Sequence, residues 1–287
     1  MPAPLLFVIS GLTQYVGAAV AVDLFARVAP AGVAWLRVAV AALVLVAWRR
    51  PWRARATWTW PSVRTAALFG VVLAGMNVAF YVAIDTLPLG TAVALEFAGP
   101  VAVAAVTGRG WRDRTAIVVA AAGVVLLAGV SLTAGHEAVR GLVAIGVAAL
   151  CWAFYIVLGR RVATAATGGL TGLSVAMAAG ALVLAPFLAH TAGPVLHDAR
   201  LALLVVVVAV CSSVVPYGIE QVVLRRVRPA TFAVLLALLP ATAAVVGAVM
   251  LRQVPHGLEV VGLLLVSGAI ALTARASDAA EEAPPPA

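Results

Sequence analysis

Charged residues are scarce in this sequence, and lysine is absent altogether. Only 10% of the 287 residues are charged, whereas about 25% is usual in soluble domains. Apolar residues make up 64% of the chain, and the mean hydropathy is +1.12. This composition excludes an ordinary soluble domain and predicts an all-α polytopic membrane protein.

Cysteine and histidine are also rare. Cys151 and Cys211 both fall within predicted membrane spans, which gives no basis for a disulfide framework. No histidine lies within a span, so we expect no metal site. The motifs G-x-S-x-G, H-E-x-x-H and G-x-G-x-x-G are missing in any suitable context. We therefore predict neither an enzyme nor a cofactor; a scaffold without substrate would not need the polar features described below.

Apolar runs fill most of the chain. A helix needs about 20 residues to cross a bilayer, and we expect ten such spans, at 4–22, 31–48, 64–84, 89–107, 115–133, 141–159, 170–188, 201–223, 230–250 and 257–274. The first run lacks a basic n-region and an A-x-A site, so we interpret it as a retained span. The segment 277–287 is acidic and rich in Ala and Pro, and we expect it to be disordered.

The arginines predict the orientation in the membrane. Thirteen of the nineteen follow even-numbered spans, whereas the loops after odd-numbered spans hold only Arg27, Arg140, Arg200 and Arg252. The positive-inside rule then places both termini on the cytoplasmic side of the inner (plasma) membrane. This distribution also accounts for the net charge of +8 without nucleic acid as a partner.

One acid, Glu96, lies inside an apolar run of helix length, 87–106. An acid at the centre of a membrane helix costs roughly 2.5–3.5 kcal/mol, so such residues usually face a bundle interior or a water-filled cavity. Pro100 cannot donate a hydrogen bond to the carbonyl of Glu96, and Gly99 thins the same turn. An acid beside a kink at membrane depth predicts a site lined by a broken helix.

Polar and aromatic side chains on other spans are candidates for the same site. Asn77 and Tyr81 share one helix face because they are four residues apart. Gln14 fits either the site or a packing contact between helices. Arg37 either extends to the outer headgroups or points inward to a carboxylate. Two later spans add Trp152, Tyr155, Pro216, Tyr217 and Glu220.

Glu220 is the second acid within a predicted span. Pro216 is expected to loosen the helical turn that precedes it. Arg225 lies only about one turn further along, toward the inner end of the helix. An ion pair at the membrane interface is therefore an equal alternative to a role for Glu220 in the site.

The chain also contains signs of an internal repeat. An offset of 140 residues aligns Pro100 with Pro240, and we expect each proline to bend its helix. An offset of 139 aligns two glycine pairs, Gly123 with Gly262 and Gly129 with Gly268. Two units of five helices, 1–139 and 140–276, would have opposite orientations because five is odd. This is the inverted-repeat plan of many secondary transporters.

Several stretches resemble the EamA-type drug/metabolite transporters, especially their threonine/homoserine exporter branch. They begin at Gly17, Met76, Cys151 and Val214, and the resemblance covers all ten expected spans. The most specific strings are A-L-E-F-x-G-P, which contains Glu96, Gly99 and Pro100, and P-Y-x-x-E, which contains Pro216, Tyr217 and Glu220. The chain departs from the family pattern at Leu239, where relatives often have an acid, and at Arg252-Gln253, where many have Gly-Glu.

The resemblance implies two inverted five-helix halves around a central cavity and the export of small amino acids, such as threonine or homoserine, by proton antiport. Efflux of other metabolites or amphipathic drugs is the alternative. We expect Glu96 to bind the ammonium group, with Asn77, Tyr81 and Arg37 as donors to the carboxylate. Because burial disfavours a charged carboxyl, proton and substrate should compete for Glu96, with Glu220 as the alternative proton carrier. The expected partners are a small-molecule substrate, protons and the lipid bilayer; monomer and homodimer both stay open.

Overall fold

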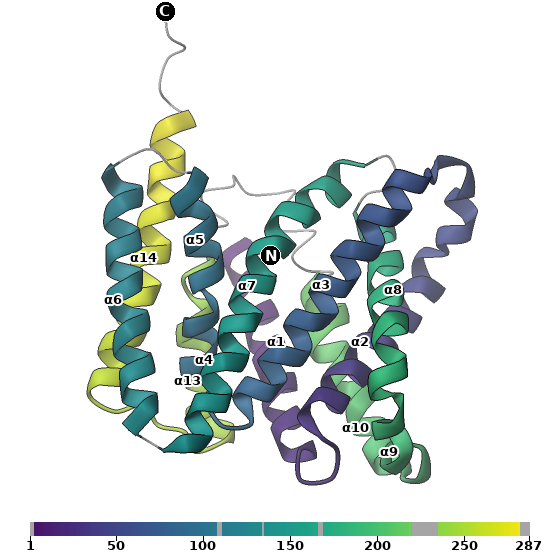
Figure 1. The fold of residues 1–287 in the computed structure, drawn as a ribbon, viewed down its shortest axis with the longest axis horizontal. Coiled ribbons are helices and arrows are strands. Elements are labelled where there is room, and N and C mark those ends of the chain that lie inside the picture. The colour runs from purple at the N-terminus through teal and green to yellow at the C-terminus, as the bar shows by residue number, and fades with distance from the viewer. Residues whose placement is uncertain are drawn as a thin grey trace, which may run out of the picture.

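The computed structural model is a bundle of long helices (Figure 1). It describes residues 3–107, 111–133, 135–165, 169–217, 219 and 235–281, and these contain no strand. The helices are α1 (Ala3–Leu24), α2 (Pro30–Arg49), α3 (Trp60–Ile84), α4 (Leu89–Glu96), α5 (Ala98–Thr107), α6 (Trp111–Thr133), α7 (His136–Thr164), α8 (Leu170–Leu188), α9 (Gly193–His197), α10 (Ala199–Ala209), α13 (Leu239–Met250) and α14 (Leu258–Glu281). Two 3₁₀ turns, η1 (Pro51–Thr57) and η2 (Ala189–Ala192), and one π-helical turn, η3 (Val210–Val214), complete the elements.

Seven helical segments in the described ranges are long and apolar enough to cross a membrane. Three shorter apolar helices accompany them, Leu89–Val103, Leu239–Met250 and Leu258–Leu272. The prediction of an all-α membrane protein is therefore confirmed. The structure differs at the C-terminal end, where α14 continues to Glu281 and includes 277–281 of the segment that we expected to be disordered.

Local sequence explains where several helices begin. Pro30 opens α2, where its missing N–H would have had no helical partner. Thr59 caps α3 and exchanges hydrogen bonds with Ser62. The carboxylate of Asp198 accepts the backbone N–H groups of Arg200 and Leu201 at the start of α10.

Two helical runs are interrupted one turn before a proline. Phe97 separates α4 from α5, directly after the Glu96 carbonyl that Pro100 leaves without its usual donor. A turn at 237–238 precedes α13, which carries Pro240 in its first turn. The two breaks lie 140 residues apart, the offset that aligns the prolines. Because α4 packs against α13, the two interrupted runs lie side by side (Figure 1).

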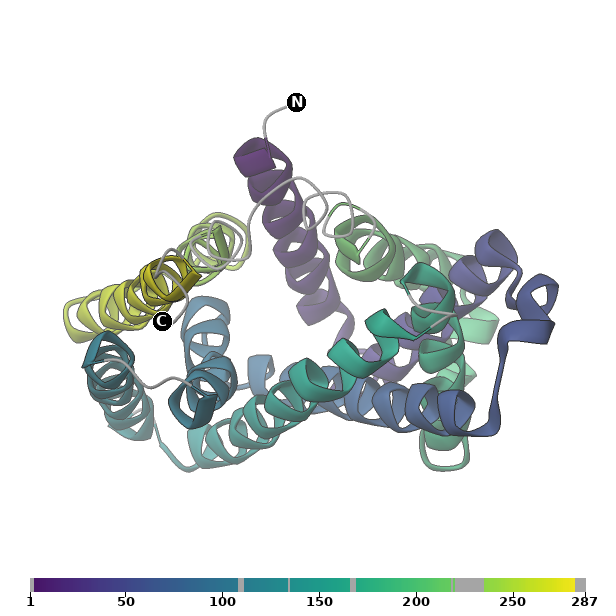
Figure 2. The same ribbon diagram turned by 90° about the horizontal axis from the view of Figure 1, so that it is seen from above.

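The packing of α6 against α14 depends on one of the glycine pairs (Figure 2). A Cβ atom at Gly123 would lie 3.1 Å from the carbonyl oxygen of Gly262, so the helices could not approach as closely with larger residues. A Cβ atom added at Gly129 or at Gly268 would have no neighbouring atom within 4 Å. Only one aligned pair therefore serves a close contact within the chain.

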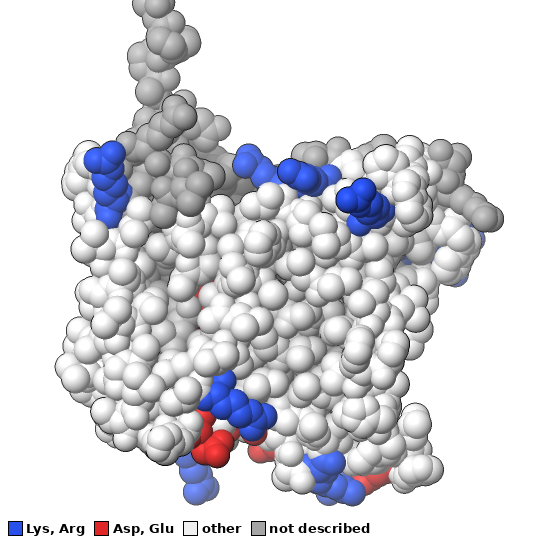
Figure 3. Space-filling model, viewed as in Figure 1, with Lys and Arg blue, Asp and Glu red and all other residues white. Residues whose placement is uncertain are grey.

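Charges gather at the two ends of the bundle, and the middle of the face in Figure 3 is almost free of them. The lower end in Figure 1 carries the loops 25–29, 85–88 and 251–257. Two ion pairs lie there, Arg27 with Asp198 at 2.9 Å and Arg140 with Asp85 at 3.5 Å.

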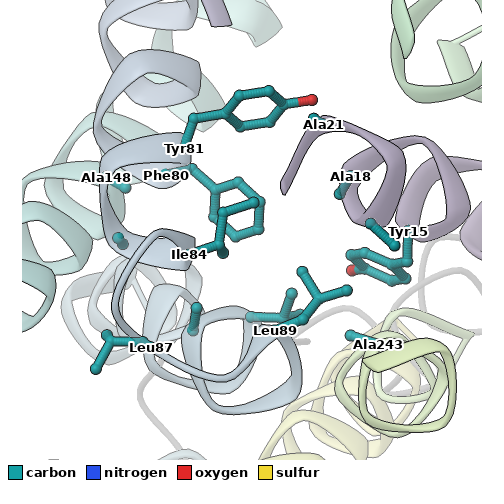
Figure 4. Packing of buried hydrophobic residues seen from close by; sticks show 14 of the residues in the cluster. Tyr15, Ala18, Ala21, Phe80, Tyr81, Ile84, Leu87, Leu89, Ala148 and Ala243 are labelled. Atoms are coloured by element: carbon teal, nitrogen blue, oxygen red, sulfur yellow. The ribbon is translucent and has the colours of Figure 1, made fainter. Parts of the chain in front are cut away.

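Buried apolar side chains fill the bundle near this lower end (Figure 4). The cluster combines the second half of α1, the end of α3, the start of α4 and α13. Tyr81, Ile84, Leu87 and Leu89 each expose 2% or less of their surface. The lower end is thus tightly packed, and the site described next borders this cluster in the bundle interior.

Candidate functional site

A cavity of about 280 Å³ lies between α1, α2, α3, the α4–α5 break, α7 and η3. The sequence analysis had assigned half of its lining residues to a site: Gln14, Arg37, Asn77, Glu96, Pro100, Trp152, Tyr155 and Tyr217. These residues come from six helices, α1, α2, α3, α4, α5 and α7, and from the helical residues that follow η3. The bundle therefore brings together side chains that are up to 203 positions apart in the sequence, from Gln14 to Tyr217.

Other candidates lie elsewhere. Glu220 lies outside the described residues, as does its alternative partner Arg225. Pro216 and Pro240 are buried but do not line the cavity. Gly99 also lies outside the cavity; it faces the backbone of α7, where an added Cβ would collide with the carbonyl group of Ala149. Gly99 thus permits α5 to approach α7 closely.

Tyr81 does not offer its hydroxyl to the cavity, contrary to our expectation. The residue is fully buried, and its hydroxyl has no hydrogen-bond partner among the described residues. Tyr81 lies one helical turn nearer the lower end than Asn77, and there Ala21 of α1 lies beside its hydroxyl (Figure 4). A shared helix face was not sufficient, because the neighbouring helix decides where along that face the cavity ends.

Glu96 is the last residue of α4 and is partly exposed to the cavity. Within the described ranges, its carboxylate has no hydrogen-bond or ion-pair partner. The helix break at Phe97 positions this acid beside the cavity. Glu96 is therefore an acceptor that a ligand could use.

Arg37 points inward, which resolves the alternative that the sequence left open. Only 5% of the residue is exposed. Its Nε donates to the Ser213 hydroxyl at 2.9 Å, and its Nη2 donates to the Ser212 carbonyl at 2.7 Å. The guanidinium carbon also lies 5.3 Å from the centre of the Tyr81 ring, within cation–π range. Among the described residues these partners hold the side chain in place, and no carboxylate there forms an ion pair with it.

The Ser212 carbonyl is available to Arg37 because of the local helix geometry. Pro216 is four residues further along and has no N–H with which to close an α-helical turn. The chain forms the π-helical turn η3 here, in which the N–H of Val215 bonds to Val210. We did not assign Ser212 and Ser213 to the candidate site from the sequence, although the i−4 rule for proline identifies the Ser212 carbonyl.

An amide and aromatic rings form another part of the cavity wall. Asn77 donates through Nδ2 to the Leu73 carbonyl at 2.8 Å, which orients the amide. Trp152 packs on Phe97 with ring centres 4.7 Å apart, and Tyr155 packs on Phe69 at 4.9 Å. Together with Glu96 and Arg37, these groups make a small cavity that suits a molecule carrying both a cationic and an anionic group.

The other apolar or aromatic lining residues, which we did not assign to the site from the sequence, are Tyr15, Ala18, Met76, Phe80, Ile156, Leu236 and Leu239. Apolar side chains are the ordinary content of a membrane span. Nothing in the sequence distinguishes those that line a cavity from those that face lipid or another helix.

Comparisons with known proteins agree with these features. The model of the EamA-like transporter family matches residues 139–275. The threonine/homoserine exporter RhtA of Salmonella typhimurium (strain SL1344) is 36% identical over 254 residues, covering 88% of this chain and 84% of that protein. RhtA of Escherichia coli (strain K12) is 36% identical over 248 residues, covering 86% and 82%. One solved crystal structure, 20% identical, shares the fold with a TM-score of 0.62 over 98% of this chain and 99% of that chain.

Proposed function

Because this chain belongs to the EamA-like transporter family, we propose that it exports small amino acids such as threonine or homoserine. The observation that carries the proposal is that Glu96 and Arg37 both line one cavity inside an apolar bundle. A zwitterion needs an acid for its ammonium group and donors for its carboxylate when it leaves water. The 36% identity to exporters of threonine and homoserine supports the same substrate class.

The proposed architecture is ten spans in two inverted five-helix units, 1–139 and 140–276. Helix breaks 140 residues apart support it, and so does the family match to 139–275, which nearly coincides with the second unit. The contact between Gly123 and Gly262 joins residues that the repeat makes equivalent.

We further propose that the protein is a multi-pass inner-membrane protein with both termini in the cytoplasm. Arginines at the ends of α2 and α7 and at the starts of α3 and α6 support this orientation, because these four helix ends lie together at the upper end of the bundle in Figure 1. In this orientation the packed lower end faces outward.

The proposed mechanism is proton antiport. Glu96 takes up a proton in the empty cavity when it is open to a more acidic exterior. It releases this proton to the cytoplasmic side as the ammonium group of the substrate arrives, because both need the same carboxylate. Arg37 and Asn77 bind the opposite end of the substrate, and Gln14, Trp152, Tyr155 and Tyr217 complete the cavity. Pro100, Gly99, Pro216 and Pro240 permit the bending that alternate access requires. Glu220 stays the alternative proton carrier.

Efflux of other metabolites or amphipathic drugs is the second candidate, and the aromatic wall formed by Trp152 and Tyr155 favours it. The cavity volume of about 280 Å³ lies at the small end of the roughly 300–1,000 Å³ that is usual for ligand pockets. A small amino acid fits such a cavity more readily.

The test is efflux of radiolabelled threonine from proteoliposomes, with and without an imposed proton gradient. We expect the gradient to accelerate efflux, and unlabelled homoserine to compete with threonine. A panel of larger apolar drugs provides the comparison. Transport of the drugs without transport of any amino acid would overturn the proposal in favour of the second candidate.

A further inference from the structure

Arg37 is a buried cation whose hydrogen bonds within the described part of the structure all go to uncharged groups. No carboxylate in the described part of the chain lies within ion-pair distance of it. The Ser213 hydroxyl and the Ser212 carbonyl are the acceptors that hold it. A buried charge is costly unless it is paired, so the site is well suited to an anionic group delivered by a ligand.

The Ser212 carbonyl oxygen in turn depends on Arg37 as its hydrogen-bond donor. Pro216 cannot supply the α-helical hydrogen bond to this oxygen, and Arg37 donates to it at 2.7 Å. The Ser212 hydroxyl donates to the backbone oxygen of Gln14 at 3.0 Å, which ties η3 to α1 as well. One side chain on α2 therefore helps to hold the irregular turn of the helix that continues to Tyr217, a cavity residue.

From these contacts we propose that Arg37 selects substrates that carry a carboxylate, by exchanging the Ser212 carbonyl for that carboxylate and so releasing the η3 turn. The inference rests on the proposed function, because it assigns a step to the same cavity. It adds that the carboxylate of the substrate, and not only its ammonium group, drives the conformational change.

The exchange is favourable for a physical reason. A guanidinium and a carboxylate carry opposite charges and can form two parallel hydrogen bonds, whereas the Ser212 carbonyl oxygen is neutral and accepts a single bond from Arg37. The Arg37 guanidinium keeps its contact with the Tyr81 ring, so the exchange needs only a small movement of the side chain. The Ser212 carbonyl then lacks a donor in a water-poor environment, which favours rearrangement of the turn. π-helical turns are frequent at functional sites.

Cys211 provides a native probe of this turn. It lies within η3, is partly buried and is not in a disulfide. The chain has two cysteines, so Cys151→Ala leaves Cys211 as the sole thiol. The rate of its alkylation by N-ethylmaleimide in lipid nanodiscs reports how often the turn opens. Binding of threonine to the same sample is measured separately by calorimetry.

We expect saturating threonine to change the alkylation rate severalfold. Threoninol, which keeps the ammonium and hydroxyl groups but replaces the carboxylate with an alcohol, should leave the rate unchanged. Arg37→Lys should abolish the response to threonine, because an ammonium cannot form the paired bonds of a guanidinium. Ser213→Ala, which retains Arg37, should raise the rate without ligand. Arg49→Lys, at the exposed end of the same helix, is the matched control and should respond like the parent.

The outcomes separate the inference from the proposed function. Threonine binding without any change at Cys211 overturns the inference and leaves the proposed function standing. An equal response to threoninol, or a normal threonine response in Arg37→Lys, also overturns it. If no small amino acid binds, the proposed function fails and the inference fails with it.

Discussion

The side-chain oxygen of Gln253 accepts the backbone N–H of Leu89 at 2.9 Å, although the two residues are 164 positions apart. Leu89 begins α4, where backbone N–H groups have no partner within the helix. Gln253 follows α13, and its own N–H bonds to the Gly247 carbonyl. This contact fastens the helix that carries Glu96 to the loop at the packed lower end.

Gln253→Ala should therefore lower the stability of the protein. Loss of the acceptor leaves the Leu89 N–H unpaired, at a cost of about 1 kcal/mol. Gln253→Glu is the matched control, because a carboxylate also accepts the bond and suits a helix N-terminus. Thermal unfolding in detergent measures both variants. Equal melting temperatures for Gln253→Ala and the parent would show that the contact does not stabilise the lower end.

Glu96→Gln should preserve the fold and abolish proton-coupled export. A neutral amide resembles a protonated carboxyl in shape, but it can neither release a proton nor pair with an ammonium group. Threonine efflux from proteoliposomes under a proton gradient is the measurement, with Glu259→Gln at the start of α14 as the control. Normal export by Glu96→Gln together with loss in Glu220→Gln would transfer the proton-carrying role to Glu220.

Pro100→Ala and Pro240→Ala should each slow transport more than they reduce the amount of folded protein. Alanine restores the N–H that the helix breaks at 97 and 237–238 lack, so the helices can straighten. Pro186→Ala is a matched control, since Pro186 lies inside α8 and does not line the cavity. Transport and monodisperse yield are compared for all three. Unchanged rates in both test variants would argue against gating at these prolines.

A topology reporter should read as cytoplasmic when it is fused after Arg53 or Arg161 and as external when it is fused after Gly193. The first two positions lie at the arginine-rich end of the bundle, and Gly193 begins α9 at the other end. Paired alkaline phosphatase and fluorescent-protein fusions give the readout. A fluorescent signal from the fluorescent-protein fusion after Gly193 would contradict the proposed orientation.

Asp198 should contribute to stability at neutral pH and lose that contribution in acid. The pKa of this carboxyl lies below its usual value, chiefly because the carboxylate accepts the backbone N–H of Leu201. The backbone N–H of Arg200 and the side chain of Arg27 lower the pKa further. A group whose pKa is lowered by folding stabilises the protein above its unfolded pKa, about 3.9 for Asp, and the effect fades as pH falls toward the native value. The difference in melting temperature between Asp198→Asn and the parent should therefore shrink as the pH falls below about 4. A difference that is constant over this range would exclude titration of Asp198.

Features that follow from covalent structure and from the thickness of a bilayer were predictable without a structure. Apolar runs of about 20 residues predict spans because a helix must satisfy its own backbone hydrogen bonds in lipid. The breaks before Pro100 and Pro240 were predictable because a proline lacks an N–H wherever the helix lies. Glu96 was identifiable for a similar reason, since an acid in an apolar run needs a polar environment.

Which side chains meet depends on how distant helices pack against one another. Arg37 could extend to lipid headgroups or turn inward, and the irregular turn of a helix 175 residues further along settled this by presenting the Ser212 carbonyl. Tyr81 shares a face with Asn77, yet α1 covers its hydroxyl. Gly123 and Gly129 are alike in sequence, but only Gly123 meets its aligned partner. These outcomes depend on contacts between distant segments, and periodicity within one helix carries no information about the helix that packs against it.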